Sequence, residues 1–177
     1  MVVAFDIETT GLNPLKNVVI LIGVKKGKQL IQWKIWEYGS EDEIILEFVK
    51  YIENVDPYDE VIIGYNALKF DLSFIVQRLN ILGKMSTKIW GILFNRKWLD
   101  LYQILGNDFR SFNSWLKRLG IRRTYEDITG KDIPFLYKLG CHDEIAKKNA
   151  DDLDTLLALY RALLKVFPPE ILPRHDP

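Results

Sequence analysis

The sequence predicts an α/β domain whose helices flank a mixed β-sheet. Three observations indicate this class. The chain starts with three strand-like segments in succession, a short β-branched segment lies between two helical patterns further on, and the longest helical pattern comes last. Of the 177 residues, 48% are hydrophobic and 27% are charged, which is typical of a folded chain with a sizeable core. No apolar run approaches the roughly 20 residues that a membrane-spanning helix needs.

Three consecutive strands are predicted at the start of the chain. Residues 2–8 alternate with period two, which places Asp6 and Glu8 on one face of the strand and only apolar side chains on the other. Residues 18–24 and 30–36 are apolar segments joined by a Lys-Lys-Gly-Lys turn, and we expect them to form a hairpin. A strand with two carboxylates on one face is unusual, so both acids are candidate functional residues.

Two helices and a buried strand are predicted next. Ser40, with a glutamate three residues later, forms a capping box, and apolar residues at helical spacing continue to about Asn54. Residues 61–64 are short, apolar and β-branched, as in a strand buried on both faces. Residues 70–82 have a helical pattern that Gly83 closes.

The second half of the chain has a mixed pattern before the last helix. We expect residues 89–94 to be extended and residues 98–101 to end another strand. A helix is predicted over residues 112–119, residues 121–140 are expected to be irregular, and residues 142–167 form a long helical pattern that two prolines stop. We therefore predict one domain over residues 1–167, followed by a Pro-rich tail over residues 168–177.

Charge and cysteine content limit the classes of protein. The 24 Lys and Arg residues balance 24 Asp and Glu residues, which is not the basic footprint of a nucleic-acid coat protein, so local features must hold any polyanion. A single cysteine, Cys141, excludes an internal disulfide and a Cys-based zinc site. The start of the chain lacks a basic-then-apolar signal pattern, and we expect a cytoplasmic location without a membrane partner.

Four carboxylates occur where the backbone could bring them together. They are Asp6 and Glu8 at the end of the first strand, Asp71 in the helix after the buried strand, and an aspartate of the last helix. Two Mg²⁺ or Mn²⁺ ions held by such hard oxygen ligands stabilise both the attacking and the leaving oxygen of a phosphoryl displacement. The pattern therefore indicates metal-dependent phosphodiester chemistry.

Two segments carry a resemblance to a known family. Residues 5–12 (FDIETTGL) resemble the first motif of the DEDD superfamily of 3′–5′ exonucleases, and residues 64–71 (GYNALKFD) resemble the second in the form found in the proofreading domain of family B DNA polymerases. The resemblance extends to about residue 164. It implies a ribonuclease-H-like fold with a five-stranded mixed sheet, two catalytic divalent metal ions and hydrolysis from a 3′ end.

The third motif requires a choice among neighbouring aspartates. At about 100° per residue, Asp152 lies within about 40° of the apolar face of the last helix, whereas Asp154 lies on the far side. Asp151 lies at the flank and is the second choice as a ligand, or a residue that supports the ligands from behind. The segment over residues 149–160 resembles the family's third motif best when Asp152 is its aspartate, so we predict Asp6, Glu8, Asp71 and Asp152 as the metal ligands.

The chain departs from the family at the residue that handles protons. The family has a tyrosine four positions, or a histidine five positions, before the third-motif aspartate, and this chain has Lys148 and Lys147 there. Three interpretations stay open: Lys148 orients or deprotonates the attacking water, it contacts a substrate phosphate, or the site hydrolyses slowly or not at all. We favour the orienting or phosphate role, because metal binding already lowers the pKa of water.

Further residues are candidates for substrate contact. The resemblance implies that Thr9 and Leu12 contact the 3′-terminal nucleotide. Asn66 suits a turn that caps the following helix, which is compatible with a site role, and Phe70 suits either the core or a stacked terminal base. The arginines near residue 120 suit either a helix end or a nucleic-acid strand; they are Arg118, Arg122 and Arg123.

Taken together, these features predict a metal-dependent 3′–5′ exonuclease acting on single-stranded nucleic acid with a free 3′ end, DNA in preference to RNA, in DNA replication or repair. An alternative is a catalytically weakened nuclease fold that binds nucleic acid or a replication partner, because Lys148 replaces the usual tyrosine. A third hypothesis is an RNA-processing nuclease on the same fold.

Overall fold

A five-stranded mixed sheet forms the centre of the molecule, with strand order β3-β2-β1-β4-β5. The computed structural model describes residues 1–106, 111–168 and 172. The strands are β1 (Val2–Thr9), β2 (Val19–Lys26), β3 (Gln29–Lys34), β4 (Val61–Gly64) and β5 (Lys97–Asp100). The first three strands pair antiparallel, whereas β4 is parallel to both β1 and β5. The α/β class and the five-stranded mixed sheet are thus confirmed.

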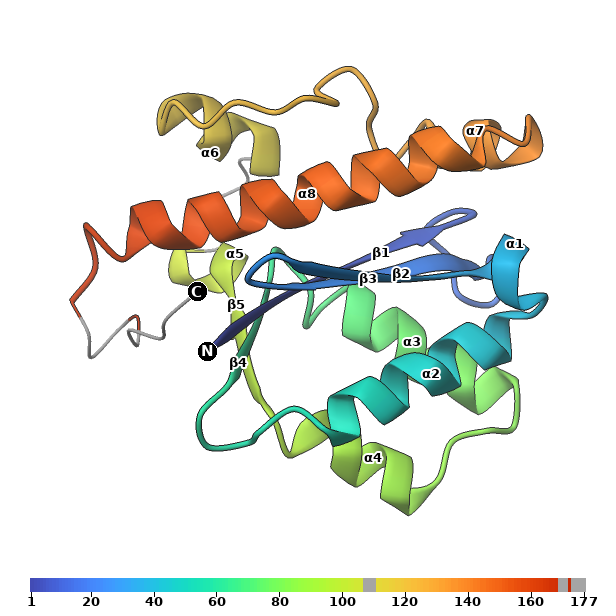
Figure 1. Ribbon diagram of the computed structural model, residues 1–177. Helices are drawn as coiled ribbons and strands as arrows, with labels where there is room; N and C mark the ends of the chain where they lie inside the picture. Colours follow the sequence, from blue (N-terminus) through green and yellow to red (C-terminus); the bar gives the residue numbers. More distant parts are fainter. Residues whose placement is uncertain (107–110, 169–171, 173–177) are drawn as a thin grey trace.

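Helices cover both faces of the sheet (Figure 1). They are α1 (Ile35–Tyr38), α2 (Glu41–Glu53), α3 (Asp71–Ile81), α4 (Thr87–Phe94), α5 (Leu101–Ile104), α6 (Phe112–Arg118), α7 (Ile133–Lys138) and α8 (His142–Leu163). The long helix α8 crosses one face, with α6 and α7 beside it, and α2, α3 and α4 lie against the other face. The central strand β1 is therefore enclosed between two helical layers.

The alternation along β1 divides its side chains between two cores. Val3, Phe5 and Ile7 pack in the core on the side of α2 and α3, while Ala4 packs against α8. Since side chains of a strand alternate between faces, Asp6 and Glu8 project toward α8. The two predicted acids thus lie under the longest helix, not on a solvent-exposed strand.

One predicted strand is a helix. Residues 89–94 belong to α4, because Ser86 caps this helix by accepting a hydrogen bond from the Ile89 backbone N–H at 3.2 Å. The helix packs beside α2, and Leu93 is fully buried there. The serine just before this helix was the available signal for it. The apolar run that follows did not indicate a helix by itself, because a short apolar run suits a buried strand as well as a helix.

Other elements also differ from the sequence prediction. The third strand ends at Lys34, and residues 35–36 start the short helix α1. The region expected to be irregular contains α7, whose first turn holds Pro134, a favourable place for proline. The last helix ends at Leu163 instead of continuing to residue 167.

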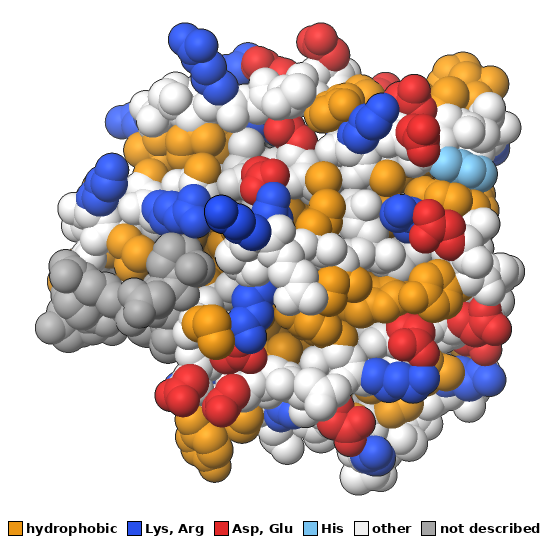
Figure 2. Space-filling view, in the orientation of Figure 1, with side chains coloured by type: hydrophobic (Ala, Val, Ile, Leu, Met, Phe, Trp, Pro, Cys, Tyr) orange, Lys and Arg blue, Asp and Glu red, His pale blue; other side chains and the backbone are white. Residues whose placement is uncertain are grey.

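The surface mixes charged and apolar groups. Figure 2 shows acidic, basic and apolar side chains interspersed on one face, in keeping with the zero net charge. Within the described residues, no helix is long and apolar enough to cross a membrane. Most of the predicted tail lies outside the described residues, but Leu172 is fully buried in the core beside α8.

Candidate active site

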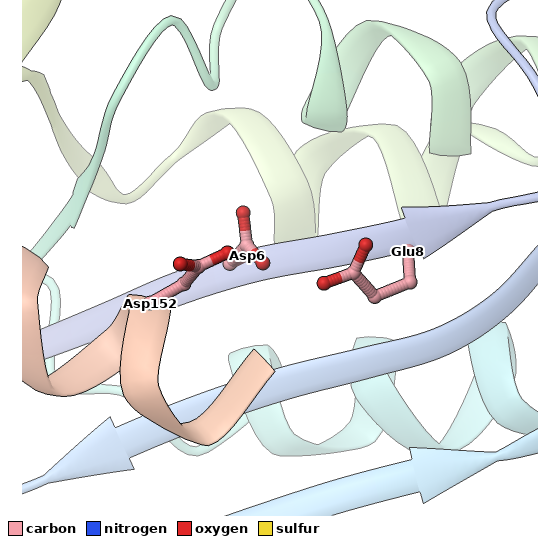
Figure 3. Close-up of side chains that lie close together, drawn as sticks. All are labelled: Asp6, Glu8 and Asp152. Atoms are coloured by element: carbon pink, nitrogen blue, oxygen red, sulfur yellow. The ribbon is translucent and has the colours of Figure 1, made fainter. Parts of the chain in front are cut away.

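The end of β1 and the middle of α8 bring three acids together. Asp6 and Glu8 point from β1 toward α8, and Asp152 points back from α8 (Figure 3). One carboxylate oxygen from each of these residues lies within 4.8 Å of the others. This acidic triad of Asp6, Glu8 and Asp152 could bind a metal ion, because hard divalent cations prefer carboxylate oxygens.

Asp71 lies outside the triad but lines a cavity together with Asp6 and Glu8. It begins α3, and its Oδ1 accepts a hydrogen bond from the Ile7 backbone N–H at 3.2 Å. Asp6, Glu8 and Asp71 all line one cavity of about 210 Å³. The structure therefore brings the four predicted acids together near the end of β1, where Asp71 is hydrogen-bonded to the strand that carries Asp6 and Glu8.

Burial makes these acids harder to ionise. It raises the pKa of Glu8 to about 7, although the positive charge of Lys148 opposes the change. Burial likewise raises the pKa of Asp6, against Lys148 and a hydrogen bond from Asn149, and raises the pKa of Asp71 well above its ordinary value. Carboxylates crowded in a poorly solvated space repel one another, and bound cations would relieve that repulsion. The donor set and its charge thus fit divalent ions.

Lys148 bridges two members of the triad. Its Nζ lies 2.9 Å from Glu8 Oε1 and 2.7 Å from Asp152 Oδ2, and the residue is only 7% exposed. Burial lowers the pKa of Lys148, but the charges of Glu8 and Asp6 outweigh that effect and leave the pKa above its ordinary value. In this arrangement Lys148 is a cation, whereas a water-activating base needs a lowered pKa.

The adjacent acids Asp151 and Asp152 have different partners. Asp151 accepts hydrogen bonds from the backbone N–H groups of Thr124 and Tyr125, at 3.0 and 3.2 Å. Asp152 forms ion pairs with Lys148 and with Arg123. Because neighbouring helical residues point about 100° apart, Asp152 faces Asp6 and Glu8, whereas Asp151 holds the loop that precedes α7.

Arg123 is a buried cation whose place sequence reasoning left undecided between a helix end and a nucleic-acid contact. It pairs with Asp152, its Nε lies 3.4 Å from Asp151, and its guanidinium lies 5.8 Å from the centre of the Phe112 ring. Asp151 therefore positions the loop that carries Arg123 to the triad. Nothing in the local sequence indicates this contact, since it joins segments 28 residues apart.

Sequence reasoning missed Asn149, which orients Asp6. The Asn149 side-chain amide donates to Asp6 Oδ2 at 2.9 Å, and Gln32 donates to Asn149 Oδ1 at 3.0 Å. Asn149 is fully buried, and such an amide requires partners. Its position three residues before Asp152, on the same face of the helix, was an available signal.

Asp100, at the end of β5, was also missed. Its Oδ1 and Oδ2 accept from the backbone N–H groups of Asn66 and Leu68 at 2.7 and 3.1 Å, and its Oδ1 also caps α5. Asn66 has a φ of 61°, the left-handed conformation that asparagine tolerates, so the turn before Asp71 is tightly fixed. An aspartate between a strand and a helix was the available signal.

The four predicted substrate residues all line the cavity beside the acids. Thr9 is buried at the end of β1, and Asn66 lies in the turn before α3. Phe70 is partly buried and lies against Phe74, whereas Leu12 is 82% exposed. A second cavity of about 140 Å³ is bounded by Phe5, Asp6, Tyr65, Phe112, Asp152 and Leu156. Asp6 thus lies between two openings.

Comparison with known proteins defines the class. Residues 3–164 match the family model of the RNase H superfamily, and the chain belongs to this superfamily. Its domain resembles the exonuclease domain of family B DNA polymerases.

Individual relatives show how far the likeness extends. An uncharacterized protein of Methanocaldococcus jannaschii, MJ0365, is 32% identical over 172 residues, which cover 90% of this chain and 93% of that protein. DNA polymerase 2 of Aeropyrum pernix is 36% identical over 86 residues, covering 46% of this chain but only 10% of the polymerase. The family B DNA polymerase structure from Pyrobaculum calidifontis has a TM-score of 0.75 at 23% identity, covering 92% of this chain and 24% of that one. The chain therefore spans only a small part of these polymerases.

Proposed function

We propose that the protein is a divalent-metal-dependent 3′–5′ exonuclease that hydrolyses single-stranded nucleic acid, DNA in preference to RNA. The acidic triad, with Asp71 lining the same cavity as Asp6 and Glu8, is the observation that carries this proposal. Membership of the RNase H superfamily and the likeness to polymerase exonuclease domains support it. Residues 1–167 would form the exonuclease domain and residues 168–177 a tail, in a protein of DNA replication or repair.

The acids would hold the catalytic metal, Mg²⁺ or Mn²⁺. Asp6, Glu8 and Asp152 supply the oxygens of the triad, and Asp71 completes the predicted set of four ligands. Bound divalent ions supply a Lewis acid for phosphodiester hydrolysis. The family resemblance implies two ions, and their number in this chain depends on Lys148, because its ammonium lies between two of the acids.

Other residues would bind and orient the end of the strand. Thr9, Leu12, Asn66 and Phe70 line the cavity next to Glu8, so a terminal nucleotide placed there lies beside the acids. The exposed Leu12 and the partly buried Phe70 offer apolar surface for a base or sugar. Lys148 and Arg123 add positive charge, which favours a phosphate at this place.

A labelled-strand assay tests the proposal. We expect a 5′-labelled single strand to shorten stepwise in Mn²⁺ and a 3′-labelled strand to release a labelled mononucleotide at once. EDTA and Asp6→Ala should each abolish both signals, whereas Asp154→Ala, at an exposed acid of α8 paired with Lys25, should not. Matched DNA and RNA strands measure the preference. Cleavage that persists with EDTA and in Asp6→Ala would overturn the proposal.

A second function, a catalytically weakened module that binds nucleic acid, is favoured by one observation: Lys148 is a cation that engages two acids where the family has tyrosine. Lys148→Tyr and Lys148→Ala separate the two functions. A large gain of hydrolysis in Lys148→Tyr alone would favour the weakened module. Loss of hydrolysis in Lys148→Ala would show that the lysine takes part in the reaction.

A further inference from the structure

The ammonium of Lys148 occupies space inside the acidic triad. Its Nζ lies at hydrogen-bonding distance from one oxygen of Glu8 and one oxygen of Asp152. A divalent ion held by the same two oxygens on the side of the ammonium would need the space that the ammonium fills. The ammonium and an ion at this position therefore exclude each other.

The ammonium is held in place by its surroundings. Lys148 is nearly fully buried, and the next residue, Asn149, anchors α8 to Asp6 through its side-chain amide. Arg123 contacts the other oxygen of Asp152, so both oxygens of this carboxylate already have a cationic partner. Moving Lys148 away would leave Glu8 Oε1 and Asp152 Oδ2 without their ion pairs in a poorly solvated space.

Lys148 already supplies part of the positive charge that the acids need. When ionised, the four predicted ligands carry four negative charges, and Asp151, which also pairs with Arg123, carries a fifth. Lys148 and Arg123 supply two positive charges, so one divalent ion leaves this group with a single net negative charge. A second ion would therefore find little negative charge left to neutralise.

We propose that the acidic triad and Asp71 together bind one divalent ion and that the Lys148 ammonium takes the place of a second ion. This inference rests on the proposed function, because it takes divalent metal binding at the triad as given. An ammonium supplies a positive charge and N–H donors for a phosphate oxygen, but unlike a metal ion it cannot coordinate oxygen ligands. The residue that replaces the family's tyrosine would thus act as a built-in cation.

Counting bound Mn²⁺ tests the inference without measuring hydrolysis. The protein is titrated with Mn²⁺ above neutral pH, and electron paramagnetic resonance reports the free ion. We expect one bound ion per chain in the wild-type protein and two in Lys148→Met and Lys148→Gln. The two ions should also show spin coupling, because paired ions of this kind lie about 3.5–4 Å apart. The control is Lys147→Met, at the exposed neighbouring lysine of α8, which should bind one ion.

Each outcome separates the inference from the proposed function. Two ions in the wild-type protein, or one ion in the wild-type protein and in both neutral variants, would overturn the inference and leave the proposed exonuclease intact. No bound ion in the wild-type protein would overturn the inference, and no bound ion in any variant would contradict the metal-dependent function as well. Circular dichroism checks that each variant folds. If neither neutral variant folds, the number of Mn²⁺ ions bound by the wild-type protein decides the question.

Discussion

Gly23 of β2 lies directly beneath Asn149 of α8. A Cβ atom on Gly23 would fall 2.0 Å from Asn149 Oδ1, a distance that no packed side chain can occupy. The missing side chain lets α8 approach the sheet closely enough for Asn149 to bond Asp6. One turn further along the same helix face, Asp152 meets Asp6 and Glu8.

Gly23→Ala should therefore displace α8 and weaken the site. We expect a loss of about 1–3 kcal/mol of unfolding free energy, as for other overpacked positions, together with weaker Mn²⁺ binding. Urea unfolding and a Mn²⁺ titration measure the two effects. Gly91→Ala in α4 is the control, because a Cβ atom there would lie 3.6 Å from the Asn95 side chain, an ordinary contact, and alanine favours a helix. Equal behaviour of the two variants would contradict the prediction.

The two adjacent aspartates of α8 should separate metal binding from stability. We expect Asp152→Asn to lower metal-dependent activity by at least about 100-fold, the upper end of the effect of losing a supporting partner of a metal site. Asp151→Asn should instead cost about 1–3 kcal/mol of stability, because backbone donors of Thr124 and Tyr125 lose a charged acceptor. Nuclease assays and urea unfolding of both variants give the comparison. The reverse ranking would show that Asp151 is the ligand.

The metal-free protein should lose stability as the pH rises from about 4.5 to about 7. Glu8 has a pKa of about 7 in the folded protein, against an ordinary value of 4.5, so the folded state binds more protons than the unfolded state in this window. The raised pKa values of Asp6 and Asp71 act in the same direction. The expected loss is on the order of 1–3 kcal/mol.

Urea unfolding in EDTA across this pH range measures the effect. Glu8→Gln should flatten the dependence, because glutamine does not titrate, and Mn²⁺ should reverse it by stabilising the ionised acids. Stability that rises with pH in EDTA would contradict this prediction.

A buried ion pair outside the acidic triad should stabilise the fold. Glu41 accepts bonds from the Arg78 side chain at 2.7–3.1 Å and from the Val19 backbone N–H at 2.7 Å, and Arg78 also donates to the Pro14 carbonyl. The pair thus ties α2 and α3 to the segment that carries Leu12. Glu41→Ala should cost about 3–5 kcal/mol, because it leaves a buried guanidinium unpaired.

An exposed pair on the same helix provides the control. Lys50 and Glu47 lie on the surface of α2, where ion pairs contribute about 0–1 kcal/mol. Lys50→Ala should therefore change the urea midpoint little. A similar loss in Glu41→Ala and Lys50→Ala would mean that the buried pair does not hold the segment.

Local sequence patterns were sufficient for most of the fold. Period-two alternation predicted β1 and the shared face of Asp6 and Glu8, and Ser40 predicted the start of α2. These features depend on residues close in the chain, so a local pattern contains them. The same reasoning was wrong for residues 89–94, because an apolar run suits a buried strand or helix equally, and packing beside α2 decided the outcome.

By itself, the sequence determined the α/β class, the two acidic motifs and the replacement of tyrosine by lysine. Only the tertiary structure decided which acids are contacted by Lys148, Asn149 and Arg123. Each of these contacts joins residues that are remote in the chain, and the contacts of Lys148 and Asn149 also require that α8 lies close against the sheet. Electrostatic contacts act through space, and the close approach of Asn149 to Gly23 that permits them arises only when the helix packs against the sheet.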